Sequence, residues 1–155
     1  MKIRLIDDAD ISAVAQLLRS LAEEFFLNES EADAASAFAR EHNEDGIGRL
    51  IHAGMVYHVA EINGQIAGFI AVRDNKHVFH MFVDKAHHGQ GIARAMWDAA
   101  RTRAIEVGNP GVFTVNSSNF AVPVYEAFGF VRTAPTQCTN GIYYNPMQLV
   151  RRNCD

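Results

Sequence analysis

The sequence has 155 residues, of which 48% are hydrophobic and 21% charged, and its formal net charge is −4. This mixture excludes a disordered or fibrous chain and predicts a single domain, 1–155, with one core. Its scattered basic residues argue against a nucleic-acid partner, and no apolar run approaches the roughly 18 residues of a membrane span. Two cysteines without C-x-x-C spacing predict neither a disulfide framework nor a zinc site. Because the N-terminus also lacks the apolar region of a signal peptide, we expect a cytoplasmic protein that binds no nucleic acid, membrane or metal.

The N-terminal half shows helical spacing first and strand patterns afterwards. The expected elements are a strand at 2–6, helices at 10–26 and 29–41, a turn at 43–48 and a short helical turn at 49–53. Three strands follow, at 56–62, 65–73 and 77–83. Asn63-Gly64 is the strongest hairpin signal, because a tight primed turn needs positive φ at both positions. These strands predict an antiparallel meander.

The C-terminal half alternates between helices and short strands. Helices are expected at 91–107 and 119–128, and strands at 112–115, 130–133 and 143–150. The crossover from 77 to 115 should bring two strands side by side in parallel. The chain is therefore predicted to be α+β, with a mixed sheet of about seven strands flanked by about four helices.

A glycine-rich loop, His88-Gly89-Gln90-Gly91-Ile92-Ala93, lies between a predicted strand and a predicted helix. The first amides of a helix have no internal partner, and the helix dipole adds partial positive charge there. Glycines let the backbone approach an anion, so the loop predicts a phosphate site, with a simple helix-starting turn as the alternative. A nucleotide-binding module is disfavoured, because the Lys-Ser/Thr end of a P-loop and the third glycine of a dinucleotide fingerprint are both missing.

Two segments together resemble the GNAT superfamily of N-acetyltransferases. Residues 83–96 are similar to its acetyl-CoA motif, Gln/Arg-x-x-Gly-x-Gly/Ala after a strand, with Gly91 and Ala93 at the small positions and His88 at the Gln/Arg position. The family also carries Asn-x-x-Ala-x-x-x-Tyr-x-x-x-Gly-Phe, and the matching residues are Ser118, Ala121, Tyr125, Gly129 and Phe130. The resemblance covers about 56–150, and residues 141–147 resemble the closing strand of small bacterial members of unassigned substrate.

The resemblance implies a GNAT-like fold, in which an antiparallel meander is joined to a splayed parallel pair, and it implies acetyl-CoA as co-substrate without a metal. It further implies transfer of the acetyl group to a primary amine of a small molecule or peptide, by direct attack through a tetrahedral intermediate. The cofactor-binding residues that it implies are Met81, Phe82, Val83, His88, Gly89, Gln90, Gly91, Ile92, Ala93, Arg94, Ser118 and Tyr125. A non-catalytic acyl-CoA-binding or sensor module is the alternative function, and a homodimer is left open.

The resemblance also assigns catalytic roles. Tyr125 is expected to donate a proton to the departing thiolate, because an ordinary phenol is protonated at neutral pH. His77 is the first candidate for the base, and His58 and Glu61 on the neighbouring strand are further contributors. His80 should face the other side of the strand from His77, since strand side chains alternate.

The acceptor wall is expected to come from the first two helices and the loop that follows them. The acidic residues there are Glu23, Glu24, Glu29, Glu31, Asp33, Glu44 and Asp45. They would suit a polyamine, an aminoglycoside or a peptide amine, although a solvated acidic face is the commoner explanation. Tyr143 and Tyr144 are further candidates for the pocket wall.

Overall fold

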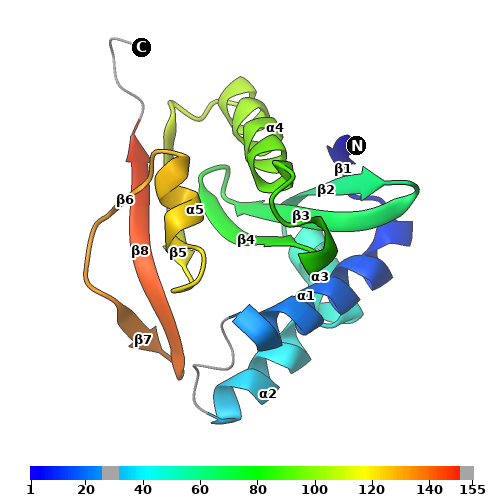
Figure 1. Cartoon of the computed structure of the whole chain (residues 1–155), viewed down its shortest axis with the longest axis horizontal. Helices are drawn as coiled ribbons and strands as arrows, with labels where there is room; N and C mark the ends of the chain where they lie inside the picture. Colours follow the sequence, from blue (N-terminus) through cyan, green and yellow to red (C-terminus); the bar gives the residue numbers. More distant parts are fainter. Residues whose placement is uncertain (26–31, 151–155) are drawn as a thin grey trace.

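The computed structural model describes residues 1–25 and 32–150 (Figure 1). Its elements are β1 (Lys2–Leu5), η1 (Asp8–Asp10), α1 (Ile11–Phe25), α2 (Ala32–Glu41), α3 (Glu44–His52), β2 (Val56–Ile62), β3 (Gln65–Arg73), β4 (His77–Val83), η3 (Lys85–His87), α4 (Ile92–Glu106), β5 (Val112–Ser117), α5 (Val122–Ala127), β6 (Val131–Arg132), β7 (Gln137–Thr139) and β8 (Ile142–Val150). The predicted α+β class is confirmed. Residues 29–31 of the predicted second helix lie outside the described residues.

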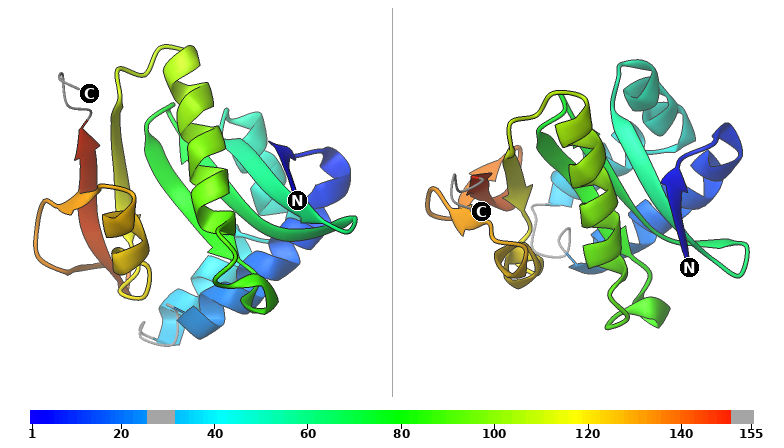
Figure 2. Two further views of the ribbon diagram at one scale, coloured as in Figure 1. Left: turned by 45° about the horizontal axis from the view of Figure 1, so that its top comes forward. Right: turned by 90° about the horizontal axis from the view of Figure 1, so that it is seen from above.

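The described strands form one mixed sheet in the order β1-β2-β3-β4-β5-β8-β6, with β7 paired to β8. Neighbours from β1 to β4 are antiparallel, as the predicted meander requires, and β4 and β5 are parallel. The parallel contact consists of only two residue pairs, His77 with Thr114 and Val78 with Val115. Beyond these pairs the two strands diverge, and Figures 1 and 2 show the sheet opening between them. The predicted splayed pair is therefore confirmed.

Helices cover both faces of the sheet (Figure 2). One core cluster joins α4 and α5 to the strands, and at its centre Trp97 packs edge to face on Phe113 and Phe130, with ring centroids 5.0 and 5.3 Å apart. A second cluster joins α1, α2 and α3 to the other face, with Leu18 and Ile47 fully buried. Each such buried side chain stabilises the fold by roughly 1.5–3 kcal/mol, so the two layers hold the diverging strands in place. Within residues 1–25 and 32–150, no helix is long and apolar enough to cross a membrane.

Residues 44–48 form the first part of α3, so the predicted turn over 43–48 is wrong. Asn43 is the N-cap, and its side chain accepts a hydrogen bond from the Gly46 amide at 2.9 Å. Two glycines lower the helix propensity of this segment, but the cap and the complete burial of Ile47 offset that cost. The Asn63-Gly64 hairpin is confirmed, because both residues have positive φ, at 52° and 78°.

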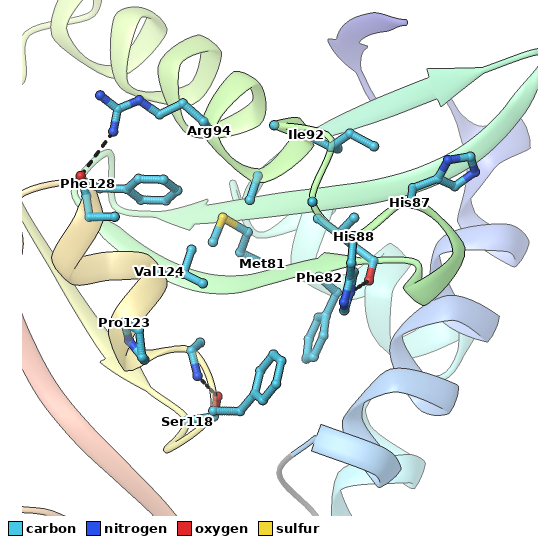
Figure 3. A pocket seen from close by; sticks show the side chains of 17 residues that line it. Met81, Phe82, His87, His88, Ile92, Arg94, Ser118, Pro123, Val124 and Phe128 are labelled. Atoms are coloured by element: carbon cyan, nitrogen blue, oxygen red, sulfur yellow. Dashed lines mark hydrogen bonds between the residues drawn. The ribbon is translucent and has the colours of Figure 1, made fainter.

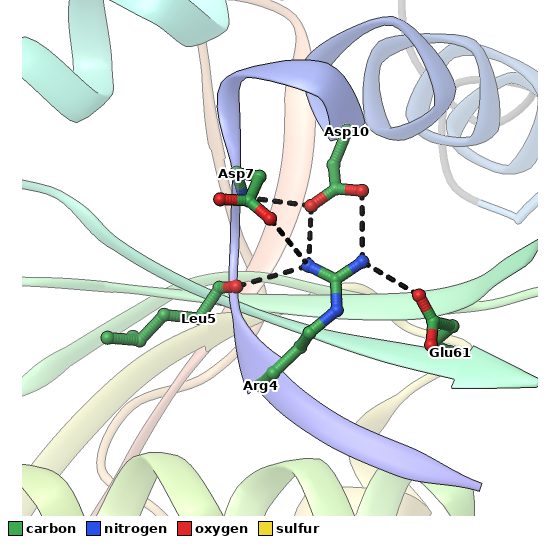
Figure 4. Close-up of polar contacts among 5 residues, drawn as sticks. All are labelled: Arg4, Leu5, Asp7, Asp10 and Glu61. Carbon is green, nitrogen blue, oxygen red and sulfur yellow. Dashed lines mark hydrogen bonds and ion pairs between the residues drawn. The ribbon is translucent and has the colours of Figure 1, made fainter. Parts of the chain in front are cut away.

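An ion-pair cluster ties β1 to the start of α1 and to β2 (Figure 4). The guanidinium of Arg4 donates to both carboxylate oxygens of Asp10, at 2.7 and 3.1 Å, and to Glu61 at 3.0 Å. Asp10 also accepts from the Asp7 amide at 2.8 Å. The hydrogen bonds from Arg4 lower the pKa of Asp10, which keeps its carboxylate charged and paired.

Candidate active site

The glycine-rich loop opens α4 with a set of unpaired backbone amides. Gly91 is the N-cap of the helix, and both it and Gly89 have positive φ, at 77° and 80°. The first backbone bond of the helix runs from the Ala95 amide to the Gly91 carbonyl at 3.1 Å. The amides of Ile92, Ala93 and Arg94 therefore have no partner inside the helix. Together with the helix dipole, these amides favour an anion at this end of α4.

A cleft of about 530 Å³ lies in front of this loop, between the diverging ends of β4 and β5 (Figure 3). The lining residues that were predicted are Met81, Phe82, Val83, His88, Gly89, Gly91, Ile92, Ala93, Arg94 and Ser118. Sequence reasoning missed the opposite wall, which consists of Phe120, Ala121, Pro123, Val124, Ala127 and Phe128 around α5. Their spacing of three and four residues marks one helical face and could have indicated this wall. Gln90 is exposed and does not line the cleft.

The backbone of β4 has an open edge along this cleft. The Asp84 amide donates to the Ala67 carbonyl of β3 at 2.8 Å, and the Phe82 carbonyl lies against Gly68 of β3. Because peptide groups alternate in direction along a strand, those of Phe82 face β3 and those of Met81 and Val83 face the cleft. Of the three residues predicted to offer backbone contacts, Met81 and Val83 are thus the ones whose peptide groups face the cleft.

His88 fastens the loop to the end of β4. Its Nε2 lies 2.8 Å from the Val83 carbonyl oxygen, and since a carbonyl can only accept, Nε2 carries the proton and donates (Figure 3). Across the cleft, the Arg94 guanidinium donates to the Ala127 carbonyl at 3.3 Å and lies 5.4 Å from the centre of the Phe128 ring. These contacts hold the loop, β4 and α5 in fixed positions around the cleft.

A second cavity, of about 410 Å³, adjoins the cleft and shares Met81, Phe82, Ser118 and Ala121 with it. Tyr125 lies one helical turn after Ala121 and lines this second cavity rather than the cleft. Its side chain is only 4% exposed. Burial raises the pKa of Tyr125, so the hydroxyl is protonated at neutral pH and can donate a hydrogen bond.

A family model described as an acetyltransferase (GNAT) domain matches residues 26–151 of the sequence. The chain belongs to the GNAT acetyltransferase family. No curated protein sequence matches it significantly. The family assignment agrees with the open β4 edge and the glycine loop, and it confirms the resemblance found in the sequence.

Solved structures of GNAT proteins share this fold over nearly their whole length. A GCN5-related N-acetyltransferase from Rhodopseudomonas palustris has a TM-score of 0.82 at 19% identity, covering 97% of this chain and 95% of that one. The PaiA N-acetyltransferase from Thermoplasma acidophilum, in complex with coenzyme A, has a TM-score of 0.76 at 13% identity, covering 97% and 100%. YncA from Salmonella typhimurium, a putative acetyltransferase with acetyl-CoA, has a TM-score of 0.72 at 22% identity, covering 97% and 93%.

Two strand histidines of this GNAT chain line the second cavity together, so the prediction that they face opposite sides is wrong. Ala71 and Val72 of β3 pair with His80 and Val78 of β4, which leaves Phe79 as an extra residue, a β-bulge. A bulge shifts the alternation of side chains by one position, and His77 and His80 consequently reach the same cavity. The Nδ1 atom of His77 is 2.8 Å from Thr114 Oγ1.

A third histidine, His42, directly follows α2 and also lines the second cavity. Its Nδ1 lies 2.9 Å from the Phe38 carbonyl oxygen, and its ring stacks on the Phe38 ring with centroids 4.1 Å apart. Burial is the main cause that lowers the pKa of His42, His77 and His80. Three neutral imidazoles are therefore expected around this cavity at neutral pH.

The other proposed contributors to the base, His58 and Glu61, do not line the second cavity. His58 points toward α4, in a small cavity beside Arg103, and Glu61 is bound to Arg4. Tyr143 and Tyr144 do line the second cavity, as expected.

None of the predicted acidic residues that the structure describes lines the second cavity. Glu24 pairs with Lys85 at the surface. Glu29 and Glu31 lie outside the described residues, as does the side chain of Asp33. Among the described residues, no group of three His, Cys, Asp or Glu side chains is placed to hold a metal ion.

Proposed function

We propose that this GNAT protein, acting as a single domain over residues 1–155, transfers the acetyl group of acetyl-CoA to a primary amine of a small molecule or peptide. The observation that carries the proposal is the continuity of the site. One cleft leads from the unpaired amides of α4, along the open edge of β4, to a second cavity lined by Tyr125. The cleft suits a long co-substrate, and the second cavity suits a smaller acceptor.

The residues of the cleft fit coenzyme A chemically. The amides of Ile92, Ala93 and Arg94, beside two glycines with positive φ, would hold the pyrophosphate. The peptide groups of Met81 and the amide of Val83 would pair with the amides of the pantetheine arm, as an added strand pairs with a sheet edge, while the Val83 carbonyl accepts from His88. Beyond these polar groups, the side chains around the cleft are mostly apolar and suit a thioester arm.

The chain would also position and protonate the reacting groups. Bound acetyl-CoA supplies an activated acetyl thioester. A backbone amide of the Met81–Val83 edge would polarise the acetyl carbonyl as negative charge develops on its oxygen. The Tyr125 hydroxyl, which is protonated at neutral pH, would donate to the departing sulfur. The second cavity would hold the acceptor amine on the other side, beside neutral imidazoles that can take its proton.

The test is turnover of the wild type and a Tyr125→Phe variant. Release of the coenzyme A thiol from acetyl-CoA is followed with spermidine, kanamycin, tyramine and trialanine as acceptors. The variant lacks only the hydroxyl, so we expect kcat to fall about 10²–10⁴-fold while acetyl-CoA binding is retained. An unchanged kcat would remove Tyr125 from this role. Acetyl-CoA binding without turnover of any amine would instead favour the non-catalytic acyl-CoA-binding module.

A further inference from the structure

The three imidazoles at the second cavity differ in which ring nitrogen is free. The Nε2 of His80 is buried without a partner, so this nitrogen cannot reach an acceptor. The Nδ1 of His77 is bound to the hydroxyl of Thr114, which can donate or accept, so either tautomer of His77 satisfies that contact. Neither environment fixes which ring nitrogen carries the proton.

The surroundings of His42 do leave such a lone pair. Its Nδ1 is bound to the Phe38 carbonyl at 2.9 Å, and a carbonyl only accepts, so the proton of the neutral ring is on Nδ1 and Nε2 has the lone pair. The ring is held between the stacked Phe38 ring and the His80 ring, whose centroid is 4.9 Å away at 80°. The residue is 6% exposed and lines the cavity, and unlike the Nε2 of His80 its Nε2 is not a fully buried atom without a partner.

Nearby charges also favour His42 as the imidazole that becomes cationic during transfer. Glu41 and the Phe38 carbonyl both favour a positive charge on the His42 ring. Arg73 and Lys76 oppose a positive charge on His77, and only Asp74 favours it. Because His80 directly precedes Met81, which borders both cavities, the His42 ring lies close to where acceptor and thioester would meet.

We propose that His42 is the catalytic base of this GNAT protein, and that its Nε2 takes the proton from the attacking amine. This inference rests on the proposed function. In the transfer, a C–N bond forms between the acceptor nitrogen and the acetyl carbon, and the C–S bond breaks. The amine proton moves to His42 Nε2, and the sulfur takes the proton of the Tyr125 hydroxyl. Solvent then returns one proton from His42 to Tyr125, which restores both residues.

The kinetic test compares His42→Asn with His77→Asn. An asparagine at 42 can keep the hydrogen bond to the Phe38 carbonyl through its side-chain amide, but it has no basic nitrogen. Thiol release is measured with the amine of the spermidine, kanamycin, tyramine and trialanine panel that the wild type uses best, and with water alone. We expect His42→Asn to lose about 10²–10⁴-fold in kcat with its acetyl-CoA affinity unchanged, and His77→Asn to lose less. A larger loss for His77→Asn would overturn the proposal.

A second measurement needs no acceptor and keeps the proposal testable if every panel amine fails. Long-range proton–nitrogen NMR correlations of the full chain with acetyl-CoA bound report which ring nitrogen of each histidine carries a proton. The proposal requires His42 with a protonated Nδ1 and a bare Nε2 near pH 7, and the His42→Asn spectrum assigns the signals. A His42 ring protonated on Nε2 would overturn the assignment of the base, and calorimetric binding of acetyl-CoA in the same sample would leave the proposed function standing.

Discussion

Replacing His80 by leucine should make the protein less sensitive to acid. The ring is buried against Phe38 of α2, and burial holds its pKa well below the ordinary value, so the folded protein keeps it neutral. In the unfolded chain the same ring takes up a proton below about pH 6.5. Protonation of the unfolded state alone lowers the free energy of unfolding as the pH falls. Between pH 7.5 and 5.5 this loss is RT ln[(1 + 10)/(1 + 0.1)], about 1.4 kcal/mol for one histidine that stays neutral when folded.

The assay is urea unfolding of the wild type and His80→Leu at both pH values. The substitution changes packing equally at pH 7.5 and at pH 5.5. Subtracting the stability difference between variant and wild type at one pH from that at the other therefore leaves only the effect of protonating residue 80. The variant should gain about 1.4 kcal/mol over the wild type on going from pH 7.5 to 5.5. His58, whose pKa is also lowered and which lies in a separate cavity beside α4, adds to the acid sensitivity of both proteins equally. An identical pH dependence in the two proteins would refute the neutral, buried His80.

Three further substitutions test the cradle and the sheet. Gly91→Ala places a side chain at a φ of 77°, a strain of about 1 kcal/mol, and we expect acetyl-CoA binding by calorimetry to weaken about 5- to 10-fold; equal affinity would speak against the loop as the anion site. Gly68→Ala would place a Cβ 2.8 Å from the Phe82 carbonyl oxygen, so urea unfolding should show a loss of about 1–3 kcal/mol, and wild-type stability would contradict this β3–β4 packing. Asp10→Asn weakens the bidentate pair with Arg4 and should cost about 1–3 kcal/mol at pH 7. Because the pKa of folded Asp10 is lowered, the wild type loses the stability of this pair as the pH falls below about 4, and its lead over Asp10→Asn should shrink there. A stability difference that does not depend on pH would exclude the ion pair as its cause.

Local signals predicted most of the fold. The meander was predictable because Asn63-Gly64 imposes a turn with positive φ between two apolar stretches, and the central residues of both strands are buried. The parallel contact between β4 and β5 followed from the length of the crossover through α4. The cleft was partly predictable, since Gly91 combines a positive φ with the start of a helix, which is a local property of the chain.

The second cavity was less predictable, because it depends on contacts between distant segments. No residue type in this strand predicts the bulge at Phe79. An expected regular alternation of side chains therefore placed His77 and His80 on opposite faces. His42 follows an alanine-rich segment of weak pattern, and only the packing of α2 against β4 brings its ring to His80. Residues 43–48 have the composition of a turn, yet the side chain of Asn43 caps a helix that contains the rest of the segment.

The most direct test of the whole account is calorimetric titration of the folded protein with acetyl-CoA, with ATP and NAD as controls. The cleft between β4 and β5 and the open amides of α4 predict micromolar binding of acetyl-CoA, weaker in the Gly91→Ala variant, and no comparable binding of either control. A folded protein that does not bind acetyl-CoA, or that binds ATP or NAD equally well, would contradict the central claim.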